Sequence, residues 1–134
     1  NKKLIPTGKF KNIKNSIYNF SNFENIGKKL NYFKNKKINI KFKGFDTTFV
    51  VKKNTRNYVG TLKNNNIKVN FFSNLPGVQL YSAQNLNYKK KLFPYQGICL
   101  ETQYFPDAPN KKNFPSTLIK PNKLYRCFTK IKIN

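Results

Sequence analysis

The sequence predicts an all-β protein, and three observations support that class. Several segments alternate apolar and polar side chains, which is the period of a half-buried strand. The apolar composition is dominated by β-branched residues and by aromatics, with 13 Phe and 8 Tyr, and these types favour strands. Helical periodicity is poor: the best helical candidate, residues 25–33, is short and begins with Ile26 and Gly27.

The first strand is predicted within residues 36–52, where Ile38, Ile40 and Phe42 fall on one face. A second alternation covers residues 67–71, and residues 78–81 form another strand after Pro76 and Gly77. Because these two strands lie on either side of a Pro-Gly turn, they predict an antiparallel hairpin.

Two further strands are predicted, one at residues 97–104, ended by Pro106 and Pro109, and one at residues 123–133. Residues 54–66 and 85–94 are polar, rich in Lys and Asn and without periodicity, so they predict surface loops. No internal repeat or linker divides the chain. Residues 1–134 are therefore expected to be one domain or part of one.

The chain has a formal net charge of +23, from 27 Lys and Arg residues against four Asp and Glu. Such a charge is typical of nucleic-acid binding. The lysines, however, are scattered among Asn, Ile, Phe and Tyr, all of which have A- and T-rich codons, and the only arginines are Arg56 and Arg126. A dedicated binder would gather Arg on one face, because guanidinium groups read bases. We interpret the charge as compositional bias with incidental, salt-sensitive polyanion binding; a selected polyanion surface stays the alternative.

Cysteine and hydropathy patterns limit the remaining classes. Cys99 and Cys127 are far beyond C-x-x-C spacing and the chain has no His, so no metal site is predicted. Both cysteines lie in apolar, strand-like contexts, which predicts reduced, buried thiols. The sequence has no run of about 18 apolar residues to span a membrane, and its first residues lack the apolar core of a signal peptide. A cytoplasmic protein is expected.

Several motifs occur in a recognisable order. The most specific is the run at residues 99–117, with CLETQ, then F-PD-x-PN, then FPST. Upstream of it lie an LIPTG segment, a G-F-D motif and a PGVQ-L-Y turn and strand, at residues 4–8, 44–46 and 76–81. A Tyr125-Arg126 strand closes the chain. In these motifs and their order the chain resembles the aldose 1-epimerase (galactose mutarotase) family.

The resemblance covers nearly all 134 residues but only the C-terminal portion of that family's domain. It implies the C-terminal part of a large antiparallel β-sandwich, with the upstream part missing. All-β sandwiches often need about 200–250 residues as one unit. The chain also begins at Asn1 rather than Met. We therefore expect a fragment, a split gene product or a truncated gene, so that residues 1–134 form a single partial domain.

Glu101 is the candidate catalytic residue. Strand alternation places Cys99, Glu101 and Gln103 on one face of their strand. From the residues alone, a single Glu in a strand is most simply a solvated surface group. The resemblance instead implies that Glu101 is the catalytic base.

Asp46 and Gln79 are the candidate substrate-binding residues. From the residues alone, Asp46 reads as a turn residue and Gln79 as a cross-strand partner. The resemblance implies that both bind sugar hydroxyls, although the chain has Thr47 where the family commonly has His after the aspartate. Asp107 is expected to cap the Pro-rich loop through side-chain to backbone hydrogen bonds.

The implied chemistry needs both a base and an acid. Interconverting the α and β anomers of an aldose removes the proton of the C1 hydroxyl and protonates the ring oxygen, so the two groups act on opposite sides of one bond system. The family's acid is an upstream histidine, and this chain has no His. The resemblance therefore implies a cofactor-free isomerase for galactose or glucose, in which this chain carries the base half, is inactive alone and pairs with a companion polypeptide.

Two other functions stay open on the sequence. One is a small basic β-rich nucleic-acid-binding module that uses Lys together with Tyr and Phe as stacking platforms. The other is a catalytically inactive sugar-binding remnant.

Overall fold

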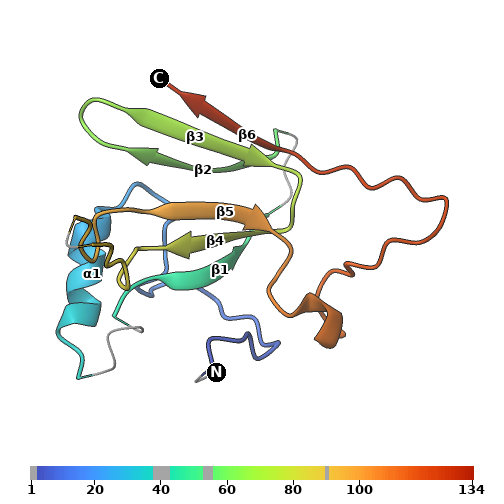
Figure 1. The fold of residues 1–134 in the computed structure, drawn as a ribbon, viewed down its shortest axis with the longest axis horizontal. Helices are drawn as coiled ribbons and strands as arrows, with labels where there is room; N and C mark the ends of the chain where they lie inside the picture. The colour runs from blue at the N-terminus through green and yellow to red at the C-terminus, as the bar shows by residue number, and fades with distance from the viewer. Residues whose placement is uncertain (1–2, 38–42, 53–55, 90) are drawn as a thin grey trace. The chain divides into compact units, whose positions relative to one another are not determined.

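The computed structural model describes residues 3–37, 43–52, 56–89 and 91–134. This part of the chain contains one α-helix, one 3-10 helix and six strands (Figure 1). In chain order they are α1 (Ile26–Lys34), β1 (Asp46–Val50), β2 (Tyr58–Lys63), β3 (Lys68–Ser73), β4 (Gly77–Tyr81), β5 (Cys99–Gln103), the 3-10 helix η2 (Ala108–Asn110) and β6 (Thr129–Ile133). The all-β prediction is confirmed in class, since the structure is mostly antiparallel sheet with little helix.

The strands form two three-stranded sheets, in the orders β1-β4-β5 and β2-β3-β6. β3 pairs antiparallel with both β2 and β6, and in Figure 1 the arrow of β4 runs opposite to that of β5. The predicted hairpin of β3 and β4 is therefore wrong, because these strands belong to different sheets. The Pro-Gly segment is a crossing between sheets, which a strand pattern does not reveal.

β2 was missed, since residues 54–66 were predicted to be a loop. The strand forms because β3 offers it a partner, with Leu62 opposite Val69 and a shift of register between Tyr58 and Gly60. Asn64 closes the turn that joins them: its side-chain oxygen accepts hydrogen bonds from the backbone N–H of Asn66 and Ile67 at 2.9 and 2.8 Å. The Asn-rich stretch thus supplies the hairpin turn for β2 and β3.

The later part of the first predicted strand is present as β1. Ile38, Ile40 and Phe42, which were predicted to share a face, lie outside the described residues. The predicted strands at the C-terminal end are present as β5 and β6.

The described chain forms two compact units. Unit 1 comprises residues 1–8, 48–79 and 101–134, and unit 2 comprises residues 9–47 and 80–100. Each strand of the β1-β4-β5 sheet contributes residues to both units.

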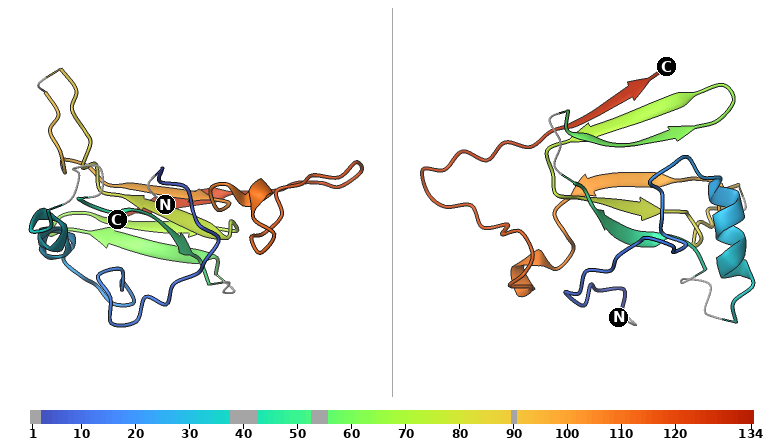
Figure 2. Two further views of the ribbon diagram at one scale, coloured as in Figure 1. Left: turned by 90° about the horizontal axis from the view of Figure 1, so that it is seen from below. Right: turned by 180° about the vertical axis from the view of Figure 1, so that it is seen from behind.

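Unit 2 is built around an aromatic cluster. Phe45 is fully buried, and the rings of Tyr18, Phe20 and Phe33 meet it edge to face at centroid distances of 5.9, 5.3 and 5.1 Å. Helix α1 supplies Phe33 and the buried Leu30. Between β4 and β5 the chain projects as a loop, yellow in the left view of Figure 2, which contains an isolated bridge between Tyr88 and Leu92.

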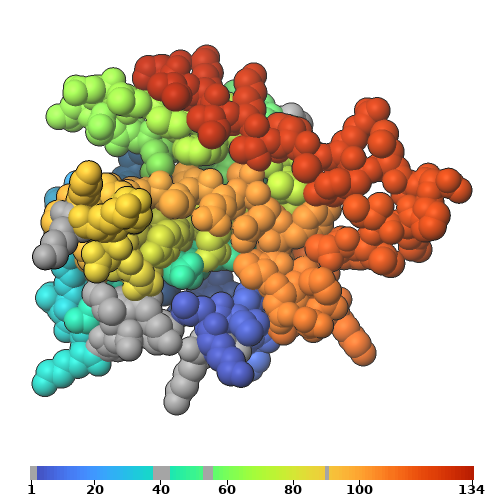
Figure 3. Space-filling view, in the orientation of Figure 1, coloured from blue at the N-terminus to red at the C-terminus, as the bar shows by residue number. Residues whose placement is uncertain are grey.

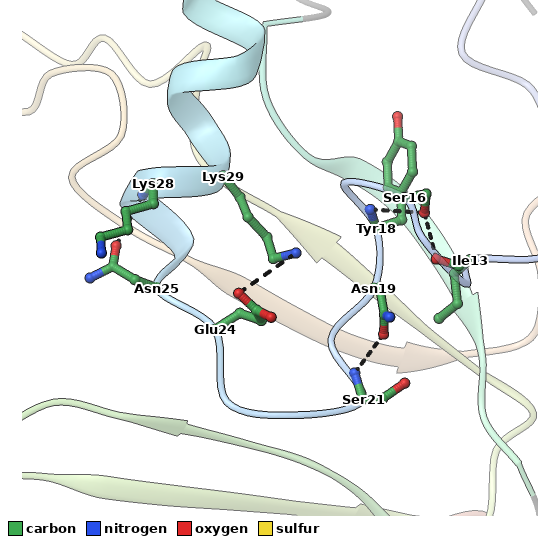
Figure 4. A network of polar contacts seen from close by, with 9 residues as sticks. All are labelled: Ile13, Ser16, Tyr18, Asn19, Ser21, Glu24, Asn25, Lys28 and Lys29. Atoms are coloured by element: carbon green, nitrogen blue, oxygen red, sulfur yellow. Dashed lines mark hydrogen bonds and ion pairs between the residues drawn. The ribbon is translucent and has the colours of Figure 1, made fainter.

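Helix α1 forms where the sequence offered its best helical candidate. The side chain of Asn25 caps the first turn by accepting a hydrogen bond from the Lys28 N–H at 3.0 Å. Figure 4 shows this end of the helix together with the preceding segment. There the Glu24 carboxylate lies 4.0 Å from the Lys29 ammonium, and the Ser16 hydroxyl donates a hydrogen bond to the Ile13 carbonyl. The cap and the buried face offset the weak helical pattern.

Unit 1 contains the β2-β3-β6 sheet and the Pro-rich region around η2. Phe105 is buried and meets Phe114 edge to face at 5.1 Å. After this cluster the chain runs as an exposed arm, orange to red in Figure 3, and every residue from 115 to 134 is exposed. The isoleucines of β6 are therefore uncovered, Ile131 at 56% and Ile133 at 69% exposure.

The prediction of buried thiols is wrong. Cys99 and Cys127 are both free and both exposed. Cys99 begins β5 on the same strand face as Glu101, and Cys127 lies in the exposed arm. No helix in the described residues is long and apolar enough to cross a membrane.

Candidate active site

Glu101 lies in the middle of β5, in unit 1, and its side chain is exposed. Leu100 and Thr102, which point to the opposite strand face, are half-buried, as alternation predicts. Thr102 is tied on that opposite face by a hydroxyl hydrogen bond to Thr129 of β6. Among the described residues Glu101 has no hydrogen-bond or ion-pair partner. Its carboxylate is therefore exposed to solvent, on a strand that the Thr102–Thr129 bond ties to β6.

Gln79 lies on β4, also in unit 1, and is half-buried. Its strand neighbours Val78 and Leu80 point to the other face and are buried, which anchors the strand. The Thr48 hydroxyl donates a hydrogen bond to the side-chain oxygen of Gln79. This bond fixes the orientation of the amide, because the oxygen must be the acceptor.

Gly77 brings β4 and β5 close together within unit 1. A Cβ built on Gly77 would lie 2.8 Å from the Phe105 ring and 3.2 Å from the Gln103 carbonyl oxygen. Any side chain larger than that of glycine would have to displace the Phe105 ring, and the start of β4 lies directly beside the end of β5. The PGVQ and CLETQ motifs, far apart in sequence, thus meet in space.

The LIPTG and FPST motifs support the same region. Gly8 has φ +90°, a conformation that favours glycine, and its carbonyl accepts a hydrogen bond from the Asn113 side chain at 2.5 Å. Phe114 packs on Phe105. Phe114 thus backs the Phe105 ring that lies against Gly77, and Gly8 is tied to the residue before Phe114.

Asp46 is the first residue of β1 and is half-buried. Thr48, two residues later, shares its face of the strand. The sequence analysis did not identify Thr48 as the residue that orients Gln79. Its spacing of two from Asp46, which puts both side chains on one face of a strand, was the signal available. Asp46 belongs to unit 2, so its membership of a common site with Gln79 and Glu101 stays a prediction. The three residues lie on three strands that are neighbours in the sheet order β1-β4-β5.

Asp107 stabilises the Pro-rich loop, although not in the predicted way. Its carboxylate accepts a hydrogen bond from the Asn110 side chain at 2.5 Å and pairs with the Lys111 ammonium. No side-chain to backbone cap is made at η2. The hydrogen bond from Asn110, followed by that from Lys111, holds the pKa of the Asp107 carboxyl below its usual value. Asp107 therefore has a structural role.

Metal ligation has no support in the described residues, where no group of three or more His, Cys, Asp or Glu side chains is placed to hold an ion. Within unit 1, the strand pair offers an exposed carboxylate at Glu101 and an oriented amide at Gln79. Such groups suit hydrogen bonding to a polyhydroxylated ligand and proton transfer from it.

Comparison with known proteins gives one consistent result. The family model described as aldose 1-epimerase matches residues 1–132. The galactose mutarotase of Bos taurus is 30% identical over 135 residues, and that of Homo sapiens 28% identical over 131 residues. Each of these alignments covers 91% of this chain and 36% of the relative.

A solved structure shows the same fold. The crystal structure of the GalM/aldose epimerase homologue from C. elegans superposes with a TM-score of 0.77 at 19% identity, covering 99% of this chain and 40% of that one. The chain thus spans little more than a third of the length of the curated relatives that it matches. The fold is a galactose-mutarotase-like β fold.

Proposed function

Because the chain belongs to the aldose 1-epimerase family, we propose that it carries the base half of a mutarotase site, acting on an aldohexose such as galactose or glucose. Glu101 takes the proton of the C1 hydroxyl, and Gln79 and Asp46 bind ring hydroxyls. The observation that carries the proposal is the placement of Glu101, an exposed carboxylate without a partner among the described residues, on the strand beside Gln79.

Strand geometry supports a shared face for Gln79 and Glu101. Gly77 lies beside Gln103, and β4 and β5 run in opposite directions (Figure 1). Alternation along each strand puts Gln79 on the same face as Gly77, and Glu101 on the same face as Gln103, which favours a shared face for the two side chains. A sugar lying on that face would meet a base and an amide that donates and accepts at once.

The charge distribution also supports Glu101 as the base. Glu24 lies against Lys29, and Asp107 is bonded to Asn110 and Lys111. Two of the four acidic residues thus have local structural partners. In a chain of net charge +23, a carboxylate without a lysine partner in the described structure is accessible to a ligand.

The reaction needs a general acid for the ring oxygen, and the family's acid is a histidine. Since the chain has no His, we propose that the upstream part of the domain supplies the acid, as a companion polypeptide or as a further part of a longer protein. This chain alone then binds sugar weakly and does not catalyse. A cytoplasmic location stays a prediction.

The nucleic-acid alternative has less support. Several lysines lie over aromatic rings of the same chain: Lys36 is 4.8 Å from the centroid of Tyr32 and Lys34 is 5.3 Å from that of Tyr95. These aromatic faces are engaged by the chain's own cations rather than offered to bases. An inactive sugar-binding remnant remains the other alternative.

Polarimetry tests the proposed function. The purified chain should leave the mutarotation of α-D-galactose at the buffer rate, and adding the separately produced upstream part of a galactose mutarotase domain should give saturable catalysis. Glu101→Gln should then lower the rate by about 10²–10⁴-fold, the range of one general base. Glu24→Gln is the matched control and should keep the rate.

Two results would contradict the proposal. Saturable turnover by the chain alone would refute the division of acid and base between two parts. Activity that survives Glu101→Gln would refute the assignment of the base.

A further inference from the structure

A buried polar cluster in unit 2 holds the backbone immediately before Asp46. Ser82 and Gln84, which follow β4, are 1% and 0% exposed. The N–H of Phe45 donates to the Ser82 hydroxyl oxygen at 2.8 Å, and the N–H of Ser82 donates to the Phe45 carbonyl at 3.0 Å. Ser82 therefore binds both polar groups of the Phe45 backbone.

The proton of the Ser82 hydroxyl is directed by Gln84. The hydroxyl oxygen lies 3.0 Å from the side-chain oxygen of Gln84 and 3.4 Å from the Phe45 carbonyl. Since a hydroxyl has one proton to donate, the shorter contact to Gln84 takes it. The hydroxyl then presents its lone pairs to the Phe45 N–H. Gln84 thus orients Ser82, and Ser82 orients Phe45.

The space around Gly44 shows how tightly this cluster fits. A Cβ at Gly44 would lie 2.5 Å from the Ser82 hydroxyl oxygen and 2.7 Å from the Gln84 side-chain oxygen. Glycine at this position leaves room for Ser82 to reach the Phe45 backbone and for Gln84 to reach Ser82. The G-F-D motif therefore needs its glycine for close approach and not only for a turn.

Neighbouring residues hold the same segment from other directions. The Tyr95 hydroxyl donates to the Lys43 carbonyl at 2.7 Å, and the Tyr95 N–H donates to the Ala83 carbonyl at 2.9 Å. Ala83, between the two polar residues, has φ +52°. A non-glycine residue in this left-handed region is strained, and such strain persists where the surroundings over-determine the backbone. The side chain of Phe45 is meanwhile enclosed by three aromatic rings.

We propose that Ser82 and Gln84 are positioning residues that fix Asp46 at the start of β1 for hydrogen bonding to substrate hydroxyls. The inference rests on the proposed function for its ligand and on the buried cluster for its mechanism. It extends the site from residues that contact sugar to a buried pair that acts through the backbone.

The test compares Ser82→Ala with two matched variants by NMR on the full chain. Ser82→Thr keeps the hydroxyl and is the conservative rescue. Ser73→Ala removes another buried serine hydroxyl, 3% exposed and bonded to the Phe128 carbonyl at 2.8 Å, from unit 1. If Ser82→Ala does not fold, Ser82→Cys replaces it.

Two readouts separate positioning from general stability. Ser82→Ala should speed hydrogen exchange of the Phe45 amide and lower the backbone order parameter of Asp46, whereas Ser82→Thr and Ser73→Ala should leave both unchanged. In a D-galactose titration, Ser82→Ala should weaken binding by roughly three- to tenfold, a fraction of what loss of a charged hydrogen bond gives. In the Asp46→Asn background it should have no further effect on galactose affinity.

The outcomes are distinguishable. Unchanged Phe45 exchange and Asp46 order in Ser82→Ala overturn the positioning role, as does a galactose affinity equal to that of the unmodified chain. Should the unmodified chain show no galactose shifts at all, the proposed function fails, and the order parameter of Asp46 still decides whether Ser82 positions it.

Discussion

Replacing Gly77 by alanine should weaken the strand pair that carries the candidate site. The added methyl would lie 2.8 and 2.9 Å from two carbons of the Phe105 ring. Carbon atoms in van der Waals contact are normally about 3.5–4.0 Å apart. The ring must therefore shift by about 0.7 Å or more, and Phe105 is buried against Phe114 and cannot move freely.

The size of the effect is isolated by a matched control. Gly60 of β2 has no atom within 4 Å of the position that a Cβ would take. In both strands alanine gains about 0.5–1 kcal/mol over glycine from the unfolded chain, so this contribution cancels between Gly77→Ala and Gly60→Ala. Overpacking a core costs about 1–3 kcal/mol, and the two variants should differ in free energy of unfolding by that amount, with Gly60→Ala the more stable.

Urea denaturation followed by circular dichroism measures this difference. At a slope of about 2 kcal/mol per molar urea, the midpoints should differ by about 0.5–1.5 M, with similar slopes. Phe105→Leu should reduce the penalty of Gly77→Ala when the two changes are combined, because the smaller side chain leaves room for the methyl. Equal midpoints for the two alanine variants would refute the close approach of β4 to Phe105.

Three further predictions concern the loop, the edge strand and the charge. Because Asn110 and Lys111 lower the pKa of Asp107, its stabilising contribution is present above the usual aspartate pKa of about 3.9 and is lost as the pH falls through the lowered value. In thermal melts, the difference in stability between the unmodified chain and Asp107→Asn should therefore shrink as the pH is lowered. A difference that is constant with pH would contradict this role. The exposed isoleucines of edge strand β6 should promote self-association. Sedimentation velocity should show less self-association for the double variant Ile131→Lys, Ile133→Lys. An unmodified chain that stays monomeric at high concentration would argue against an uncovered face. Binding to single-stranded RNA should be weak, indifferent to sequence and steeply lost between about 50 and 200 mM salt; tight, sequence-selective binding at the higher salt would favour the nucleic-acid alternative.

Strand partners were the least predictable part of the fold. The alternation of side chains in β3 and β4 identifies two strands and their faces, because the pleat has a period of two. It carries no information on which strand lies next to which. The turn at Asn64 brings β3 beside β2, and β4 enters the other sheet.

Burial was also mispredicted where it depends on distant segments. Cys127 lies in an apolar local sequence, yet it is exposed. The Asn74 side chain bonds to the Arg126 carbonyl and the Phe128 N–H on either side of Cys127, and these contacts leave the thiol uncovered. Local hydropathy indicates which residues would be stable inside, whereas the contacts that cover them come from elsewhere in the chain.

The sequence by itself determined the β class, the positions of four strands and the family, because each of these is encoded in short contiguous patterns. It also supplied Glu101, Gln79 and Asp46 as candidates, through motifs of a few residues. The tertiary structure alone decided how those candidates are held. The Thr48 bond to Gln79 joins residues 31 positions apart, and the Ser82 bond to Phe45 joins residues 37 positions apart. Contacts over such separations arise only when strands pair, so no local pattern in the chain predicts them.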